Sequence, residues 1–275
     1  MKLSSRLLRR VIIATVFLAV FFLFGYGTRQ LTQTPPSCTD GIKNGEEEGA
    51  DCGLFACGNY CEPDLDPPKV ISTQLIEAGE GDYDFVAVIE NPHPKFGASE
   101  VVYELTLFNG NENKLSKTEG MFYILPGQTK YFVLTHLRTD KNVQKIDFKI
   151  KSAKWQKLDS LEGLNLIVRN EKYTNLGRSA GSALDAIIFN DSDFDFDRID
   201  IDVVLLNSSG KIIAVHKSDI RTFLARTERG FLVVWPFRID GRVDRTEIYP
   251  STNLFENSNF IKKYGSSIEK FQEYE

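Results

Sequence analysis

Four cysteines, clustered in one short acidic stretch, are the residues of this chain best suited to covalent or metal chemistry. They follow a C-x13-C-x4-C-x3-C spacing at Cys38, Cys52, Cys57 and Cys61. Cysteines this close together form disulfides or bind zinc, and the paired C-x2-C spacing typical of zinc modules is absent. We therefore expect disulfides, with zinc as the alternative, and the spacing leaves all three connectivities open.

Oxygen-bearing side chains between these cysteines could bind a hard cation. Ca²⁺ takes roughly six to eight oxygen ligands, and the stretch supplies Asp40, Asn44, Glu46, Glu48 and Asp51. The full spacing of a Ca²⁺-binding loop is absent, however, and the stretch contains the turn-forming dipeptides Asp40-Gly41 and Asn44-Gly45. A solvated acidic turn is therefore the alternative to a Ca²⁺ site.

A second acidic segment carries aspartates at every other position, which places them on one side of an extended loop: Asp191, Asp193, Asp195 and Asp197. Ca²⁺ could neutralise this stripe, and a solvated acidic loop is the alternative. Asp200 and Asp202 are assigned to the solvent face of the strand that follows. Phe194 and Phe196 are either exposed partner contacts or a cover over the open end of a core.

A catalytic site is not apparent in the sequence. The three histidines, His93, His136 and His216, lie in unrelated contexts, and no motif of a serine nucleophile, a zinc protease or a phosphate-binding loop occurs. We therefore expect no enzymatic activity. A hydrolase that uses carboxylates such as Asp193 and Asp195 is the alternative, although no paired acid and base can be named.

One uncharged apolar segment, residues 11 to 27, is close to the length that crosses a bilayer. The basic residues Lys2, Arg6, Arg9 and Arg10 precede it, so the positive-inside rule places the N-terminus in the cytoplasm and the rest of the chain outside. A cleaved signal peptide has similar features and is the alternative. An extracytoplasmic location also favours the disulfide interpretation of the cysteines.

Composition excludes some classes of protein and partner. The 275 residues are 42% hydrophobic, with 20 Phe and 10 Tyr, which is enough to fill globular cores. The formal net charge of -5 argues against a partner held by phosphate contacts, so we expect no nucleic-acid binding. The expected partners are the membrane, through residues 11–27, and a protein or another component of the cell envelope.

From Val70 onward the sequence alternates with the period of β-strands, and turn signals recur every eight to twelve residues or so. The chain also repeats after about 99 residues, so that Leu184, Ala186 and Ile188 take the places of Phe85, Ala87 and Ile89. The fold class expected is therefore mainly β, with two tandem immunoglobulin-like β-sandwiches after the apolar helix and a small disulfide-bonded module.

Two resemblances to known modules accompany these patterns. Residues 105–109 (Leu-Thr-Leu-Phe-Asn), followed by residues 125–129 (Leu-Pro-Gly-Gln-Thr), resemble the FxLYD-type domain of the late-embryogenesis-abundant β-sandwich group. The second copy has Ala225-Arg226 in place of Pro-Gly. Residues 38–53 resemble a C-x-D-G-x-x-N-G module of cell-surface proteins, with Leu54 replacing its second closing glycine. The FxLYD-type resemblance implies that the sandwiches are extracytoplasmic modules without enzymatic activity.

These observations divide the chain into eight expected segments. They are a basic cytoplasmic tail (1–10), a transmembrane helix (11–27), a linker (28–37), a Cys-rich acidic module (38–61), a Pro-rich linker (62–69), two β-sandwiches (70–158 and 159–256) and a tail with helical spacing (257–275). We expect a membrane-anchored binding, adhesion or envelope-scaffold protein. An accessory subunit of a larger envelope or secretion assembly is the alternative.

Overall fold

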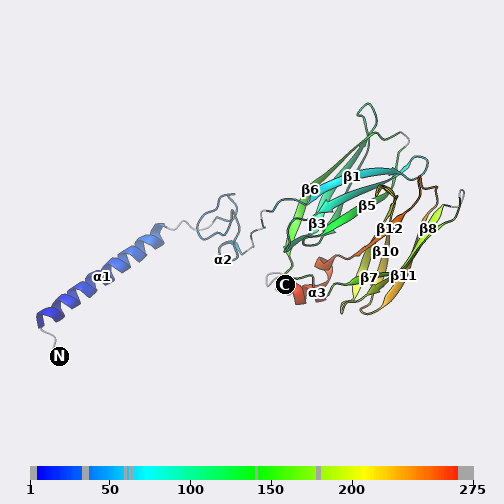
Figure 1. The fold of residues 1–275 in the computed structure, drawn as a ribbon. Helices are drawn as coiled ribbons and strands as arrows, with labels where there is room; N and C mark the ends of the chain where they lie inside the picture. The colour runs from blue at the N-terminus through cyan, green and yellow to red at the C-terminus, as the bar shows by residue number, and fades with distance from the viewer. Residues whose placement is uncertain are drawn as a thin grey trace. The chain divides into compact units, whose positions relative to one another are not determined.

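The structure, a computed structural model, describes residues 5–32, 37–58, 61, 63, 65–139, 142–177 and 181–265. For residues 5–8 and 27–32 it describes the backbone alone. The chain divides into two compact units, Met1–Asp64 and Leu65–Glu275 (Figure 1).

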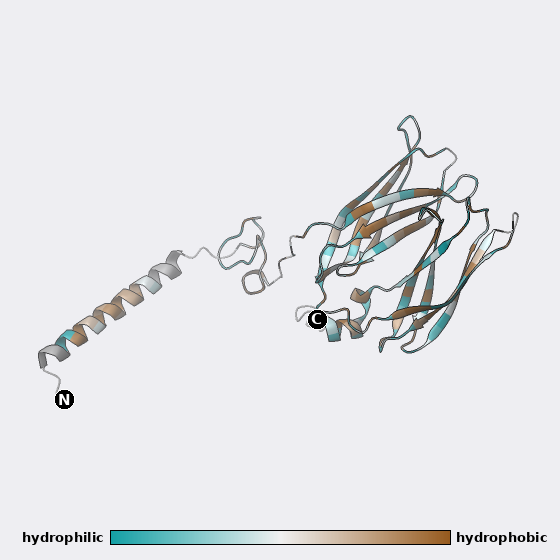
Figure 2. Ribbon diagram, in the orientation of Figure 1, coloured by the Kyte–Doolittle hydropathy of each residue, from teal (hydrophilic) through white to brown (hydrophobic). Residues whose placement is uncertain are grey.

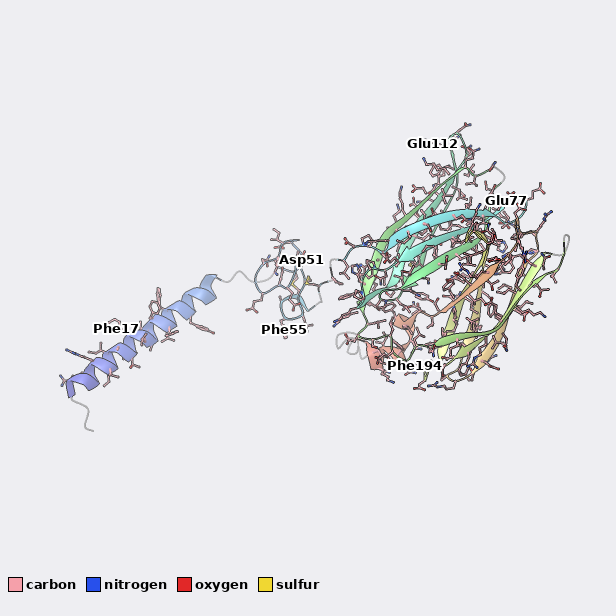
Figure 3. All side chains as sticks on the ribbon, in the orientation of Figure 1. Phe17, Asp51, Phe55, Glu77, Glu112 and Phe194 are labelled. Carbon is pink, nitrogen blue, oxygen red and sulfur yellow. A yellow bond between two sulfur atoms is a disulfide. The ribbon has the colours of Figure 1, made fainter. Side chains whose placement is uncertain are left out.

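The first unit begins with an apolar helix, α1 (Ser5–Thr32), whose apolar residues lie all around its axis (Figure 2). Phe17, one of them, is 73% exposed (Figure 3). The window Arg9–Tyr26 is long and apolar enough to cross a membrane, and an N-terminal signal sequence has the same properties. The structure therefore contains the expected helix.

Two disulfides, Cys38–Cys57 and Cys52–Cys61, cross-link the acidic stretch of the first unit. The disulfide prediction is confirmed. A zinc site at these cysteines is excluded because their four sulfur atoms are bonded in two pairs. Between residues 37 and 58 no apolar side chain is buried, and Phe55 of the short helix α2 (Leu54–Cys57) is 92% exposed. The cross-links therefore replace a hydrophobic core in this module.

The second unit consists mainly of strands. The first six are β1 (Lys69–Glu77), β2 (Asp82–Glu90), β3 (Phe96–Phe108), β4 (Lys114–Ile124), β5 (Thr129–Arg138) and β6 (Lys145–Lys157). The next six are β7 (Leu166–Asn175), β8 (Ser182–Asn190), β9 (Phe196–Leu206), β10 (Ile212–Phe223), β11 (Glu228–Trp235) and β12 (Arg245–Ser251).

Each set of six strands forms two three-stranded antiparallel sheets. The sheets of the first sandwich are β1-β2-β5 and β4-β3-β6, and those of the second are β7-β8-β11 and β10-β9-β12. Strands β7 to β12 thus repeat the topology of β1 to β6 one for one. The prediction of two tandem β-sandwiches is confirmed.

The residues predicted to point inward form the cores of the two sandwiches. Phe85, Ala87 and Ile89 are fully buried in the first, and Leu184, Ala186 and Ile188 are at most 3% exposed in the second. An asparagine ends each of these strands and is buried as well. Asn91 donates through Nδ2 to the carbonyl oxygens of Phe96 (2.7 Å) and Leu125 (2.8 Å). Asn190 does the same to Phe194 (2.8 Å) and Leu224 (3.1 Å), so both copies use one turn design.

The two sandwiches pack face to face, a contact that the sequence pattern did not predict. The outer face of sheet β1-β2-β5 meets the outer face of sheet β10-β9-β12 (Figure 1). An apolar cluster fills the contact with Ile76, Val86, Val133, Val204, Leu206 and Val215. The second unit is therefore a stack of four sheets, and its two middle sheets are covered on both faces.

A short helix, α3 (Ser258–Tyr264), follows the turn η1 (Leu254–Glu256) and covers one end of the second sandwich. Phe260 is fully buried there against Phe194, at 5.1 Å between ring centroids. The helical spacing expected for the tail is therefore present over these residues. Ile268 and Phe271, which continue the pattern, lie outside the described residues.

Candidate functional site

The acidic residues of the Cys-rich module bind backbone amides. Asp51 accepts hydrogen bonds from the amides of Asp40 (2.9 Å) and Gly41 (2.6 Å), and Asp40 accepts from the amide of Ile42 (2.9 Å). Glu47, which was not among the predicted ligands, is 5% exposed and accepts from the amide of Asn44 (3.1 Å). The carboxylates therefore hold the turns together, as a core would in a larger module.

Of the predicted Ca²⁺ ligands of the module, Asp40 accepts a 2.8 Å hydrogen bond from the Asn44 side chain, but no three of the described acidic side chains are close enough to share a metal ion. Among the described residues, the group of His, Cys, Asp or Glu side chains close enough to share a metal ion is Cys38, Glu47 and Cys57. Its two sulfurs form a disulfide with each other and cannot bind a metal. The structure thus does not bring Asp40, Glu46, Glu48 and Asp51 into one coordination sphere.

In the second acidic segment, an arginine neutralises part of the predicted stripe. Arg226 pairs with Asp191 and, at 2.8 Å, with Asp193. The hydrogen bond and charge of Arg226 lower the pKa of Asp193, so this carboxyl is a poor general acid. Asp195 accepts a 2.7 Å hydrogen bond from the amide of Ala225. The side chains of Asp193, Asp195 and Asp197 are exposed on one side, as predicted, but partners within the chain hold two of them.

The two phenylalanines between these aspartates are not exposed contacts. Phe194 is 8% exposed and Phe196 is 1% exposed, and both belong to the core of the second sandwich. They point inward because the alternation that exposes the aspartates buries the residues between them. Of the two predicted roles, the structure supports the cover over the end of the core.

The histidines have structural partners in different places. His93 contacts the carbonyl oxygen of Asp66 at 2.9 Å, and His136 pairs with Asp82 at 3.2 Å. His216 lies edge-on to the ring of Trp235, and burial lowers its pKa. No two of the three are equivalent in the repeat, although the charge of His136 also lowers the pKa of His216.

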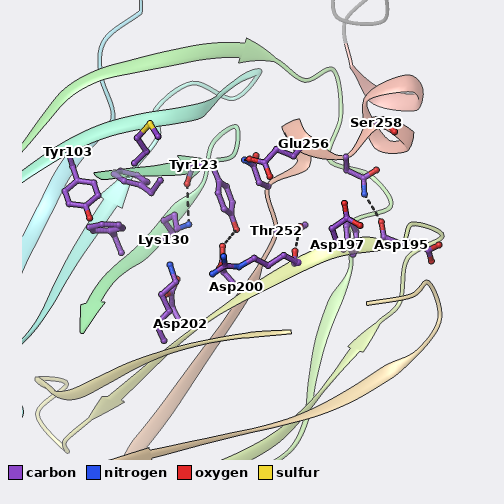
Figure 4. A pocket seen from close by; sticks show the side chains of 18 of the residues that line it. Tyr103, Tyr123, Lys130, Asp195, Asp197, Asp200, Asp202, Thr252, Glu256 and Ser258 are labelled. Carbon is purple, nitrogen blue, oxygen red and sulfur yellow. Dashed lines mark hydrogen bonds and ion pairs between the residues drawn. The ribbon is translucent and has the colours of Figure 1, made fainter. Parts of the chain in front are cut away.

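A cleft of about 580 Å³ opens where the two sandwiches meet. Strands β4 and β5 line it from the first sandwich, and β9, η1 and α3 line it from the second (Figure 4). It lies beside the apolar contact of the two middle sheets. Its polar residues include Tyr123, Lys130, Asp200 and Asp202, which come from both sandwiches.

Lys130 of β5 is buried in this cleft, with 8% of its surface exposed. Its ammonium group donates to the carbonyl oxygen of Tyr123 at 3.3 Å and lies 4.3 Å from the centre of the tyrosine ring. Burial lowers the pKa of Lys130, and the negative charges of Asp202 and Asp200 oppose that change. The ring and the carboxylates thus hold a cation within the domain contact.

Asp202 corrects the sequence prediction, which placed it on a solvent face. It is 3% exposed, because the outer face of β9 lies against the first sandwich. Its Oδ1 atom has no hydrogen-bond partner among the described residues. Burial raises the pKa of Asp202 to about 6, against the influence of Lys130 and Lys217. A buried acceptor without a donor is costly and is a feature of binding sites.

Asp200 and Tyr123 tie the two sandwiches together beside this acceptor. The Tyr123 hydroxyl donates to Asp200 at 3.3 Å and lies 3.0 Å from the hydroxyl of Ser251. Asp200 also forms an ion pair with Arg198 at 2.9 Å. The cleft therefore offers a fixed polar wall with one unused acceptor, which suits binding of a donor group better than acid-base catalysis.

Sequence signals for this site existed. Val203-Val-Leu-Leu206 and Phe85-Val-Ala-Val-Ile89 are continuous apolar runs within the alternating strands. Such runs are typical of strands that are buried on both faces. Together they indicate that the outer faces of β2 and β9 are covered, and Asp202 follows from that placement. Which residues of the first sandwich meet Asp202 depends on the packing angle, which the pattern does not contain.

Comparisons with known proteins assign no family to the chain. No protein-family model matches it, and no curated protein matches it. Among solved structures, it is similar to the calcium binding domain CBD12 of CALX1.1 at 10% sequence identity, over 66% of this chain and 81% of that chain, with a TM-score of 0.19. At that score the likeness carries no argument about calcium or about function.

Proposed function

We propose that this chain is a membrane-anchored extracytoplasmic binding or scaffold protein without catalytic activity, and that the cleft between its sandwiches is where a partner binds. The single observation that carries the binding role is the unused acceptor of Asp202, 3% exposed and directed into a polar cleft that both sandwiches build. The apolar helix α1 and the two disulfides support the extracytoplasmic location. The FxLYD-type resemblance is consistent with such a module.

Location is tested by a membrane-impermeant protease and by thiol labelling. Protease added to cells with an opened outer envelope is expected to remove the sandwiches and leave a fragment that contains α1. A polyethylene-glycol maleimide is expected to label no cysteine before reduction and four after it, because all four are bonded in pairs. Full protection of the sandwiches, or labelling without reduction, would place them in the cytoplasm and contradict the proposal.

Binding at the cleft is tested by site-specific photocrosslinking in the native membrane. A photoreactive phenylalanine replaces Ser258, which lines the cleft and is exposed. The matched control replaces Lys149 on the outer face of sheet β4-β3-β6, where it pairs with Asp147. We expect an adduct from position 258 and none from position 149. Equal adducts from both positions, or none from either, would argue against the cleft as the binding site.

A role as an accessory subunit of a larger envelope assembly is the second candidate, and one surface favours it. The outer face of β11 carries Leu232, 62% exposed, and Val234, 41% exposed. Leu232 takes the place that Val133 occupies in the first sandwich, where the same face is covered. Extraction in mild detergent followed by sizing is the test. A particle larger than the monomer that the Leu232→Asp variant loses would support it, and a strict monomer would oppose it.

A further inference from the structure

The loop end of the second sandwich contains another cavity, separate from the cleft. It has a volume of about 560 Å³ and lies between the end of β7, the start of β8 and the loop from β11 to β12. Its lining combines the arginines Arg238 and Arg242 with Ser182 and with Tyr173, Ile239 and Val243. No residue of the cleft contributes to it.

Both arginines are without a carboxylate partner in the described part of the chain. Five other described arginines of the second sandwich form ion pairs: Arg169, Arg198, Arg221, Arg226 and Arg245. Arg238 and Arg242 are both exposed and line the same cavity. The same loop carries the exposed Asp240 and Asp244, but neither is among the described residues that line the cavity. In a chain with a net charge of -5, the two arginines of the lining therefore give the cavity a local positive charge.

Ser182 adds an independent sign of a ligand at this place. It is 2% exposed, and its hydroxyl oxygen has no hydrogen-bond partner among the described residues. Ser182 is the first residue of the central strand β8, with the same parity as the inward residues Leu184 and Ala186, so it lies at the end of the core. A buried hydroxyl without a partner costs free energy that a bound acceptor would recover.

We propose that this cavity binds a tetrahedral oxyanion, a phosphate or sulfate group carried by a small organic molecule. Guanidinium groups donate pairs of hydrogen bonds in a geometry that fits such an oxyanion, and the serine hydroxyl supplies a further donor. The cavity is larger than the anion itself, and Tyr173, Ile239 and Val243 give it an apolar wall for the organic part of the ligand.

The first sandwich has a shorter loop at the place where the second carries both arginines. Its corresponding loop, between β5 and β6, spans residues 139–144, whereas the loop between β11 and β12 spans 236–244. The extra length carries both arginines. At the same end of the first sandwich, the β1–β2 hairpin and the start of β2 carry the acidic residues Glu80, Asp82 and Asp84 instead.

Equilibrium dialysis of the full chain in detergent tests the proposal, with inorganic phosphate, sulfate and glycerol phosphate as probes at constant ionic strength. The double variant Arg238→Gln/Arg242→Gln is compared with the control Arg229→Gln, an exposed arginine outside the cavity. We expect one site per chain in the wild type and in the control. The double variant is expected to bind at least tenfold more weakly, and Ser182→Ala to bind several-fold more weakly.

The thermal midpoint without a probe shows that each variant is folded. Vesicles that contain phosphatidic acid form a further arm, because a lipid headgroup could supply the same chemistry. Binding of vesicles that free glycerol phosphate displaces assigns the anion to a lipid, and binding of the soluble probe alone assigns it to a free ester. Equal binding by the double variant and the control, or no binding of any probe by the wild type, would overturn the proposal.

Discussion

Asp202 is the residue whose ionisation the fold opposes most clearly. Its pKa is raised from 3.8 to about 6 by burial, so the folded state holds its proton to a higher pH than the unfolded state does. The stabilisation from this group is fully present below pH 3.8 and is lost as the pH rises through about 6. Asp84, whose pKa burial also raises to about 6, acts in the same direction.

We therefore expect the wild type to lose stability relative to Asp202→Asn as the pH rises from 4 to 7.5, by about 2.4 kcal/mol. The isosteric amide does not titrate, so the difference between the two proteins isolates this carboxyl from Asp84 and from His216, whose lowered pKa acts in the opposite direction. Urea unfolding at both pH values measures the difference. A constant difference would show that Asp202 is not desolvated.

Asn190 supports a prediction about the turn that both copies share. Replacing it with alanine removes the two hydrogen bonds that it donates to the carbonyl oxygens of Phe194 and Leu224 and the two that it accepts from the amide and hydroxyl of Ser192. The carbonyl acceptors are left in or beside the core. We expect a loss of about 2–4 kcal/mol of unfolding free energy. Asn91→Ala should cost a similar amount because its two bonds are equivalent.

The exposed turn residue Asn109 provides the control for this pair. Its side chain accepts from the amides of Asn111 (3.0 Å) and Asn113 (2.9 Å), which water can bind in its place. Asn109→Ala is therefore expected to cost about 1 kcal/mol or less. If all three variants lose the same unfolding free energy in chemical denaturation, burial does not explain the contribution of the asparagines to stability.

Among the elements, the Cys-rich module buries no apolar side chain between residues 37 and 58 and depends on its cross-links and on the hydrogen bonds of its carboxylates. The disulfides close loops with sequence separations of 19 and 9 residues, and a loop of that size contributes about 3 kcal/mol through the unfolded state. We expect the variant Cys52→Ser/Cys61→Ser to be cut rapidly by protease between residues 38 and 61. The sandwiches, which contain no cysteine, should keep their unfolding midpoint.

A wild-type module treated with a reducing agent should be cut as fast as the variant, and restoring oxidising conditions should protect it again. Protease resistance of the reduced module would mean that the hydrogen bonds of Asp51 and Glu47 suffice to hold it. In that case the acidic side chains, and not the disulfides, would be the main stabilising feature of this element.

The strands show how far the sequence predicted the fold. Alternation in residues 85–91 and 184–190 predicted the inward faces and the repeat, because a period of two residues follows directly from strand geometry. The same alternation led to the wrong place for Asp202. The strand period shows which residues share a face but not what covers that face. The sheet that covers the outer face of β2 comes from a part of the chain more than a hundred residues later.

Unlike the strands, the two candidate binding sites could not be predicted from the sequence. The cysteine spacing predicted disulfides because proximity in sequence sufficed, whereas Lys130 and Asp202 meet only through the contact of the two sandwiches. Arg238, Arg242 and Ser182 come together from loops at one end of a sandwich. The residues of neither site follow a fixed spacing in the sequence, so no sequence motif could have indicated that they lie together.

At the scale of the whole molecule, the apolar contact between the sandwiches makes them one folding unit. Val133 is 1% exposed in that contact, whereas its equivalent in the second copy, Leu232, is 62% exposed on a free face. We expect Val133→Asp to uncouple the sandwiches, because a carboxylate cannot be buried there without a partner, and Leu232→Asp to leave them coupled. The chain has two tryptophans, Trp155 in the first sandwich and Trp235 in the second, so each sandwich carries its own fluorophore.

Variants that retain one tryptophan each, Trp155→Phe and Trp235→Phe, measure the two sandwiches separately in urea. Without the interface change the fluorescence transition of each variant should coincide with its own circular-dichroism transition, because unfolding of either sandwich exposes the apolar face of the other. With Val133→Asp the transitions should separate by about 1 M urea, which corresponds to a loss of about 2 kcal/mol at an ordinary dependence on urea. With Leu232→Asp they should still coincide. Separate transitions in the unmodified interface would mean that the sandwiches fold independently and that the cleft between them opens freely.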